Sequence, residues 1–219
     1  MTPLILALDT TRECGSLALA RGAEALEEVA LHAPEGFAHV IYGQIQSLLE
    51  RHQLAVCEVD CFAAASGPGS FTGVRVGLAC IKGLAHACAK PAAAVSNLAA
   101  LASFGTAPLR AAVMDARRGE IYGGLYNAQG EAVRPEMVAP LAVWLDTLPP
   151  EVQFVTLDFP LDLTGTRFQG AGVIAAANPV AGAIARIAFE RWQRGQVFDP
   201  AGLDANYVRR SDAELFWKD

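Results

Sequence analysis

The fold is decided by one stretch of the chain, Ser66-Gly67-Pro68-Gly69-Ser70-Phe71-Thr72-Gly73-Val74-Arg75-Val76-Gly77. An apolar run, residues 61–65, precedes it, and a helix-like segment, residues 74–89, follows it. Glycine accepts a positive φ and proline fixes φ, so this composition predicts a tight turn between a strand and a helix. Ser70 or Thr72 is suited to cap that helix through its side-chain oxygen. The stretch therefore predicts backbone amides at a helix N-terminus, which can face an anion or a partner surface.

Known phosphate-binding and catalytic loops do not match this stretch. A P-loop requires lysine after its second glycine, and valine follows Gly73 here. The pattern Gly-x-Gly-x-x-Gly would place Thr72 where its third glycine belongs. A nucleophile elbow requires serine midway between two glycines, a position that Phe71 occupies. The pattern alone thus leaves a structural role and a binding role equally open.

The amino-acid composition indicates which classes of protein this chain can belong to. The chain has 219 residues, of which 53% are hydrophobic and 18% charged, so we expect a large buried core. The net charge of −6 argues against binding of nucleic acid by this chain alone, because phosphate backbones require clustered Lys and Arg. We find neither a membrane-length apolar segment nor the basic start of a secretory signal. Five cysteines without a Cys-x-x-Cys pattern argue against a disulfide framework and predict a reduced, cytoplasmic protein.

The pattern of apolar residues predicts two lobes, residues 1–104 and 105–219. In the first lobe we expect strands at 4–8, 15–20, 25–31, 61–65 and 92–95, and helices at 37–49, 74–89 and 96–103. In the second lobe we expect strands at 111–115, 120–127 and 153–157, a strand after Gly130, and helices at 141–145 and 180–194. Both lobes then follow the order strand, strand, strand, helix, strand, helix, although residues 141–172 are weakly patterned.

Three motifs carry a resemblance to a known family. They are Leu6-Ala7-Leu8-Asp9-Thr10-Thr11, the glycine loop Gly67 to Gly77, and Asp115-Ala116-Arg117-Arg118-Gly119-Glu120-Ile121-Tyr122. Together with the C-terminal Asn206-Tyr207-Val208-Arg209 they resemble the bacterial TsaB (YeaZ) family. The resemblance implies the actin, hexokinase and Hsp70 superfold, an α/β architecture with duplicated βββαβα lobes.

The same resemblance implies a role in forming threonylcarbamoyladenosine beside the tRNA anticodon. A metal-binding paralogue, TsaD, transfers the threonylcarbamoyl group, and a small ATPase, TsaE, completes the set. TsaB is regarded as a non-catalytic scaffold that pairs with TsaD through its first-lobe helices. The resemblance leaves open a homodimer and a bound ATP or ADP within the complex. It implies no cofactor in the isolated chain, no membrane, and contact with tRNA only through the complex.

Histidine spacing gives an independent argument against catalysis. The paralogue holds its metal with two histidines four residues apart on the first helix, whereas Gly43 stands four residues after His39 here. His32 lies seven residues before His39, in a preceding strand or loop, which is a poor geometry for one metal. We therefore predict no metal site and no enzyme activity in this chain. The alternative is a free-standing ATP-dependent kinase or acyl transferase of the same superfold.

Two sets of residues are candidates for contacts with other molecules. The first set would bind a nucleotide or another anion: Asp9, Thr10, Gly67, Gly69, Ser70, Gly73, Arg117 and Arg118. For Asp9 a structural role in its turn is the favoured interpretation, and for Arg117 and Arg118 it is that of solvated residues at a hairpin tip. We expect Asp115 and Glu120 to pair with these two arginines across the hairpin. The second set would form the partner surface: Phe37, Ile41, Ile45, Arg75, Gly77, Leu78 and Lys82.

Overall fold

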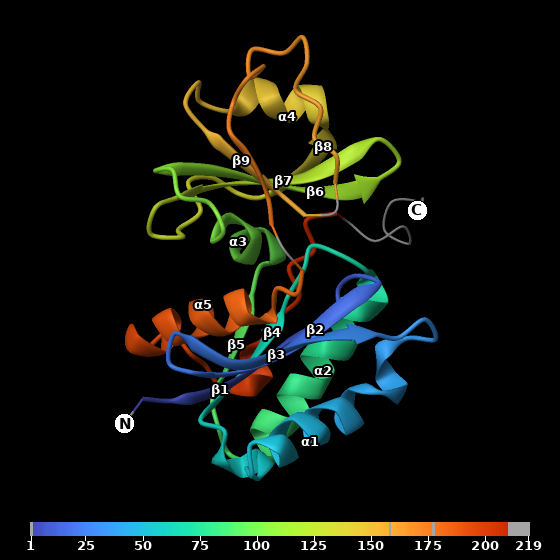
Figure 1. Cartoon of the computed structure of the whole chain (residues 1–219), viewed down its shortest axis with the longest axis vertical. Coiled ribbons are helices and arrows are strands. Elements are labelled where there is room, and N and C mark those ends of the chain that lie inside the picture. The colour runs from blue at the N-terminus through green and yellow to red at the C-terminus, as the bar shows by residue number, and fades with distance from the viewer. Residues whose placement is uncertain (1, 158, 177, 210–219) are drawn as a thin grey trace, which may run out of the picture. The chain divides into compact units, whose positions relative to one another are not determined.

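The computed structural model describes residues 2–157, 159–176 and 178–209 (Figure 1). The chain divides into two compact units. The first comprises residues 1–97 and 178–206, and the second comprises residues 98–177 and 207–219.

The first unit is built on a five-stranded sheet in the order β3-β2-β1-β4-β5. Its strands are β1 (Leu4–Asp9), β2 (Cys14–Arg21), β3 (Glu24–His32), β4 (Cys61–Ala65) and β5 (Ala92–Val95). β1 pairs antiparallel with β2 and parallel with β4, so the C-terminal ends of β1, β4 and β5 lie at the same edge. All six residues of β1 are buried, as expected for a central strand covered on both faces.

Helices cover both faces of this sheet (Figure 1). On one face lie α1 (Ile41–Arg51), which follows a short 3-10 helix η1 (Phe37–His39), and α2 (Phe71–Ala87). The other face is covered by α5 (Ala181–Gln193), which packs on β1, β2 and β4. Side chains alternate along a strand, so Leu4, Leu6 and Leu8 join the same core as Ile41 and Ile45 of α1.

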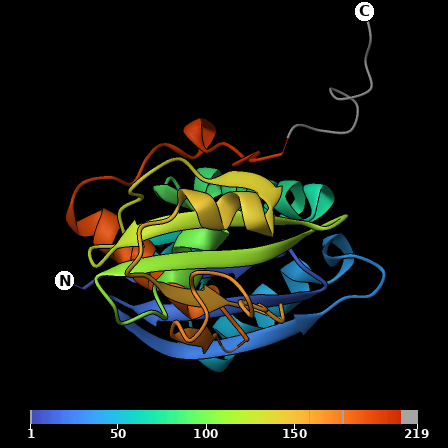
Figure 2. The ribbon, with the colours of Figure 1, turned by 90° about the horizontal axis from the view of Figure 1, so that it is seen from above.

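The second unit repeats this topology with the sheet order β10-β9-β6-β7-β8. Its strands are β6 (Leu109–Arg117), β7 (Glu120–Asn127), β8 (Met137–Pro140), β9 (Gln153–Thr156) and β10 (Val173–Ala175). β6 takes the place of β1, since it pairs antiparallel with β7 and parallel with β9. Helix α4 (Leu141–Thr147) lies over β7 and β8 (Figure 2). Trp144 of α4 is buried there, and a Cβ on Gly123 of β7 would lie 2.3 Å from its ring.

The structure differs from the expected division at residue 104 in two respects, the first being that residues 98–104 belong to the second unit. The C-terminal helix was expected in the second lobe, whereas α5 packs on the sheet of the first unit and residues 178–206 belong to that unit. The helix pattern is visible in the sequence, but its apolar stripe does not reveal which sheet it covers. The short helix α3 (Asn97–Ala102) and the remaining predicted elements match the structure to within a few residues.

A disulfide contradicts the prediction that all cysteines are reduced. Cys57 and Cys88 are bonded, and Cys14, Cys61 and Cys80 are free. The two bonded residues are 31 positions apart in the chain, while their Cα atoms are 5.0 Å apart. Counting cysteines cannot detect a single bridge of this kind, because the fold alone brings the two positions together.

Across the described residues, no helix combines the length and the apolar character that a membrane span would need.

Candidate functional site

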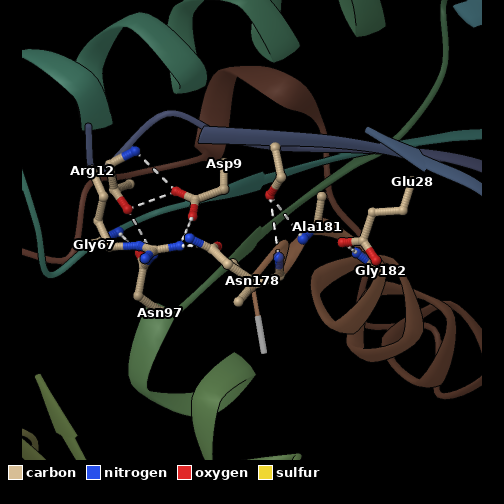
Figure 3. Close-up of polar contacts among 11 residues, drawn as sticks. Asp9, Arg12, Glu28, Gly67, Asn97, Asn178, Ala181 and Gly182 are labelled. Carbon is tan, nitrogen blue, oxygen red and sulfur yellow. Dashed lines mark hydrogen bonds and ion pairs between the residues drawn. The ribbon is translucent and has the colours of Figure 1, made fainter. Parts of the chain in front are cut away.

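Asp9, at the C-terminal end of β1, is the centre of a buried polar network in the first unit (Figure 3). Its Oδ1 accepts hydrogen bonds from the backbone N–H of Thr11 at 2.9 Å and from the Thr11 hydroxyl at 2.6 Å. Its Oδ2 lies 3.5 Å from a guanidinium nitrogen of Arg12, which donates to Asn178 Oδ1 at 2.8 Å. Asp9 is 0% exposed. The carboxylate is therefore held by its own turn and by a neighbouring cation.

Asn97 connects this turn to the glycine loop (Figure 3). Its amide nitrogen donates to the Thr11 hydroxyl at 2.7 Å, and its Oδ1 accepts from the backbone N–H of Gly67 at 3.0 Å. The backbone N–H of Asn97 returns a bond to the Gly67 carbonyl at 2.9 Å. Thr11 can serve both partners because a hydroxyl donates one hydrogen bond and accepts others. The ends of β1, β4 and β5 are thus joined by buried side chains.

The glycines of the loop are required by close packing against Thr10 and Thr11. A Cβ on Gly69 would lie 2.6 Å from the carbonyl oxygen of Thr11, and one on Gly73 would lie 2.0 Å from that of Thr10. A Cβ on Gly77 would lie 2.5 Å from the hydroxyl of Thr10. That hydroxyl donates to the Gly73 carbonyl at 2.7 Å. Helix α2 therefore begins pressed against the end of β1.

Several loop amides that the sequence offers to an anion have partners within the unit. Ser70 caps α2, as predicted, because its side-chain oxygen accepts from the backbone N–H of Gly73 at 3.3 Å. The backbone N–H of Ser70 donates to the Thr11 carbonyl at 2.7 Å, and that of Gly67 donates to Asn97. The structure brings six of the eight predicted anion-binding residues to the ends of β1 and β4 and the start of α2, where Asp9 contacts Thr11 and Gly67 contacts Asn97.

The sequence did not reveal the partners of this network. Arg12, Asn97 and Asn178 come from three distant segments that only the fold unites. The same is true of the N-terminus of α5, where Ser16 Oγ accepts from the N–H of Ala181 at 3.0 Å and Glu28 accepts from that of Gly182 at 2.7 Å (Figure 3). Both bonds satisfy helix amides that lack a partner within the helix.

Arg117 and Arg118 lie in the second unit, at the tip of the β6–β7 hairpin. Both are exposed and adopt left-handed backbone conformations, with φ of 62° and 57°. Asp115 and Glu120 do not face each other across the hairpin, contrary to the expected register. Asp115 stands opposite Ile121 and accepts from the backbone N–H of Arg117 at 2.7 Å, whereas Glu120 pairs with Arg209. The register contains a bulge between Asp115 and Arg117, which shifts the two carboxylates out of alignment.

Comparison with known proteins identifies the family. Residues 32–190 match the family model of TsaD, the tRNA N6-adenosine threonylcarbamoyltransferase. The chain is 33% identical over 227 residues to the tRNA threonylcarbamoyladenosine biosynthesis protein TsaB of Bacillus subtilis (strain 168), and the alignment covers 97% of each protein. The chain belongs to the TsaB (YeaZ) family. The family resemblance seen in the motifs is thereby confirmed, and with it an involvement in tRNA threonylcarbamoyladenosine biosynthesis.

Solved structures agree with the TsaB family and with its fold. YeaZ from Pseudomonas aeruginosa has a TM-score of 0.76 at 29% identity and covers 94% of this chain and 99% of its own. The activator of the 2-hydroxyisocaproyl-CoA dehydratase from Clostridium difficile has a TM-score of 0.55 at 8% identity, covers 88% of this chain and 97% of its own, and shares the fold alone. The predicted actin, hexokinase and Hsp70-like fold with duplicated α/β lobes is confirmed.

The C-terminal motif of the TsaB family has a structural role in this chain. The backbone N–H of Asn206 donates to the Ser66 carbonyl at 2.7 Å, beside the glycine loop of the first unit. In the second unit, Arg209 donates to the Ala116 carbonyl at 2.9 Å and to Glu120, and its guanidinium lies 5.7 Å from the centre of the Tyr122 ring. Burial raises the pKa of the Tyr122 hydroxyl, so this side chain is neutral near pH 7.

The predicted partner surface of the TsaB family needs correction in this chain. Five of its seven residues are buried in the core of the first unit: Phe37, Ile41, Ile45, Gly77 and Leu78. Their apolar character correctly predicts that these side chains are buried in a contact. That contact is with the sheet and with neighbouring helices of the same chain. A charged substitution at one of them would disrupt the fold before it tested any partner.

The outer surface of the two helices is formed by other residues. On α2 an exposed row runs at intervals of four: Phe71, Arg75, Ala79, Gly83 and Ala87. The Arg75 guanidinium stacks on the Phe71 ring, 3.7 Å from its centre. Tyr42 of α1 is 57% exposed and hydrogen-bonds the Cys80 thiol of α2. Lys82 is half-buried and donates to the Ala201 carbonyl at 3.4 Å. We call the exposed row together with Tyr42 the outer helix face.

Proposed function

We propose that this chain is a non-catalytic subunit of the machinery that forms N6-threonylcarbamoyladenosine beside the tRNA anticodon. It pairs with a TsaD-like paralogue that carries the metal and performs the transfer, and a TsaE-like ATPase joins through that complex. The relatives are named for this biosynthesis, and the match of residues 32–190 to the transferase family supports a paralogous partner. This assignment places the protein in the cytoplasm, where tRNA is modified.

The observation that carries the non-catalytic role is the state of Asp9. In a nucleotide-hydrolysing member of this superfold, a carboxylate at this position would face magnesium and phosphate. Here the carboxylate is fully buried, accepts two hydrogen bonds from Thr11 and faces the Arg12 guanidinium. A cation that already neutralises a carboxylate competes with a metal for the same charge. We infer a structural role for Asp9, in which Oδ1 accepts both hydrogen bonds and Oδ2, which has no hydrogen-bond partner among the described residues, faces the Arg12 cation.

The glycine loop supports the same conclusion. Phosphate-binding loops use glycine so that ligand oxygens can approach the backbone closely. In this chain the closest approach at Gly69 and Gly73 is made by the backbone of Thr10 and Thr11. In the direction of a Cβ, each of these two glycines is therefore already covered by the chain itself. We therefore assign no nucleotide to the isolated chain, and any ATP or ADP belongs to the assembled complex.

The outer helix face is the surface that we assign to the partner. It presents exposed aromatic rings, Phe71 at 41% and Tyr42 at 57%, beside the small residues Ala79 and Gly83. Aromatic side chains provide large contact areas, and small residues let two helices approach closely. The paralogue presents helices of the same fold, so the pairing is helix against helix. Without the paralogue a second copy of this chain could use the same face.

Contact with tRNA is assigned to the complex, with Arg117 and Arg118 as this chain's contribution. Both arginines are exposed at the tip of the β6–β7 hairpin, and guanidinium groups bind phosphate with paired hydrogen bonds. The net charge of −6 makes independent binding of tRNA weak. Arginines at one projecting turn can add affinity once a partner has docked the tRNA.

A reconstituted reaction tests the proposed function. Unmodified tRNA is incubated with ATP, threonine, bicarbonate and the partner proteins, with and without this chain, and threonylcarbamoyladenosine is detected by mass spectrometry. We expect product only when the chain is present, and equal product with the variant His39→Ala, whose side chain is exposed on η1. Equal product without the chain would refute the role of a required subunit.

A second measurement separates a scaffold from a free-standing enzyme. The isolated chain is incubated with MgATP, and both nucleotide binding and phosphate release are measured. We expect neither, because Asp9 is engaged by Thr11 and Arg12. ATP hydrolysis by the isolated chain that is lost in Asp9→Asn, while Arg12→Lys retains it, would instead identify an ATP-dependent enzyme.

A further inference from the structure

The disulfide between Cys57 and Cys88 joins a short 3-10 helix of the first unit to the C-terminal end of α2. Cys57 lies in the short 3-10 helix η2 (Val56–Glu58), and its residue is exposed. Cys88 is the C-terminal cap of α2 and is half-buried. Their Cα atoms are 5.0 Å apart, within the usual span of a disulfide. The disulfide therefore links an exposed residue to the end of the helix that bears the outer helix face.

The same two segments are held together without the disulfide. Lys90 forms an ion pair with Asp60 at 3.3 Å, and Asp60 accepts from the backbone N–H of Leu4 at 2.9 Å. The last turn of α2 is closed by the backbone N–H of Lys90, which donates to the Ala85 carbonyl at 2.9 Å. Breaking the disulfide thus leaves the fold with other contacts at this end. A bond that is accessible and not essential to the core suits reversible chemistry.

The free cysteines differ from this pair in their chemical environment. Cys61 and Cys80 are buried, and burial raises the pKa of their thiols to about 12 and about 11. Thiols with raised pKa carry little thiolate near neutral pH and react slowly. Cys14 is half-buried on β2. Exchange chemistry in the native protein is therefore expected at the exposed Cys57.

We propose that Cys57 and Cys88 form a thiol–disulfide exchange site for a dithiol reductant. A thiolate of the reductant attacks Cys57 Sγ, the Cys57–Cys88 bond breaks, and Cys88 leaves as a thiolate that takes up a proton. The second thiol of the reductant then attacks the mixed disulfide, closes the reductant's own disulfide and releases Cys57. Two electrons pass to the protein, and the end of α2 is released from η2.

The test uses the full chain and dithiothreitol as the reductant. After purification without reductant, denaturation and alkylation, we expect three labelled cysteines and a tryptic peptide pair linked through Cys57 and Cys88. Native protein incubated with millimolar dithiothreitol should then gain two labels, with its circular dichroism spectrum unchanged. Cys14→Ser is the matched control, because it removes a free thiol and should leave the linked peptides intact. Cys57→Ser should abolish them.

Hydrogen exchange measures the structural consequence of reduction. We expect amide exchange in residues 86–90 to accelerate by about tenfold, which corresponds to ~1.4 kcal/mol of local opening free energy. Exchange in β1 should not change. The proposal is overturned by five labelled cysteines in the oxidised protein, by reduction that occurs only at denaturant concentrations that unfold the chain, or by exchange at residues 86–90 that is identical in both redox states.

Discussion

Replacing Gly83 with arginine places a charge on the outer helix face without disturbing the core. Gly83 is exposed on α2, and a Cβ built there meets no atom within 4 Å. By contrast, Gly77 on the same helix faces Thr10 at 2.5 Å, so a substitution at that position would damage the fold. Gly83→Arg therefore separates an effect on pairing from an effect on folding.

Gly83→Arg is expected to stabilise the fold slightly and to weaken pairing strongly. Arginine has a higher helix propensity than glycine, which adds about 0.8 kcal/mol to the stability of an exposed helix. For a protein of this size, that gain raises Tm by about 2 °C. At a helix–helix contact, an unpaired buried charge costs about 3–5 kcal/mol. Such a cost weakens pairing by about 100- to 5,000-fold.

Isothermal titration of the purified TsaD-like paralogue with each variant measures the effect on pairing, and calorimetric Tm measures the effect on folding. Ala128→Arg is the matched control, since it adds the same charge at an exposed turn after β7. We expect it to pair like the unmodified chain. If Gly83→Arg is at least as stable as the unmodified chain and pairs within about threefold of its affinity, the outer helix face is not the partner surface.

Three further predictions concern stability. Ala89 closes α2 with a left-handed φ of 51°, so Ala89→Gly should raise the free energy of unfolding in urea by about 1 kcal/mol; an unchanged value would mean that the residue is unstrained. Gly73→Ala should lower the free energy of unfolding by about 3 kcal/mol, because its Cβ would lie 2.0 Å from a carbonyl oxygen. Gly83→Ala, its control, should raise that free energy by about 0.8 kcal/mol. Equal effects of the two variants would refute the packing role of the loop. A hydrogen bond from Arg51 holds the pKa of Glu27 below its ordinary value. The Glu27 carboxylate therefore stabilises the fold at pH values above its unfolded pKa of about 4.3. This stabilisation is lost as the pH falls through the lower pKa that Glu27 has in the folded protein. Glu27→Gln should therefore lower Tm at pH 7 and have little effect at pH 2; an equal loss at both pH values would contradict this account.

Much of the fold could be predicted because its signals are local. Short sequence patterns predict a strand or a helix at three places, and the structure has these elements there: the glycine loop, the Ser70 cap and the apolar strand β1. What the sequence could not supply is the partner of each element. Helix α5 has a clear apolar stripe, but only the fold places it on the first sheet.

Some residues of the candidate site could be found from the sequence and others could not, for the same reason. Asp9, Thr10 and the loop glycines were found from the sequence, because their residue types are unusual at the end of a strand. Arg12, which faces Asp9, and Asn97, which contacts Thr11, were missed since the network depends on chain segments far apart. Most residues predicted for the partner surface are buried in the core, for a related reason. Apolar residues dominate both the buried side and the exposed row, so the sequence alone does not distinguish them.

The glycine loop connects the buried network to the outer helix face. Gly69 and Gly73 allow α2 to begin in direct contact with Thr10 and Thr11, and this contact fixes the position and rotation of the helix. The next residues along the helix include Phe71 and Arg75, which begin the exposed row. The loop thus determines which side chains α2 presents to solvent. We therefore propose that the residues that resemble a nucleotide site act in this chain by holding the outer helix face in place.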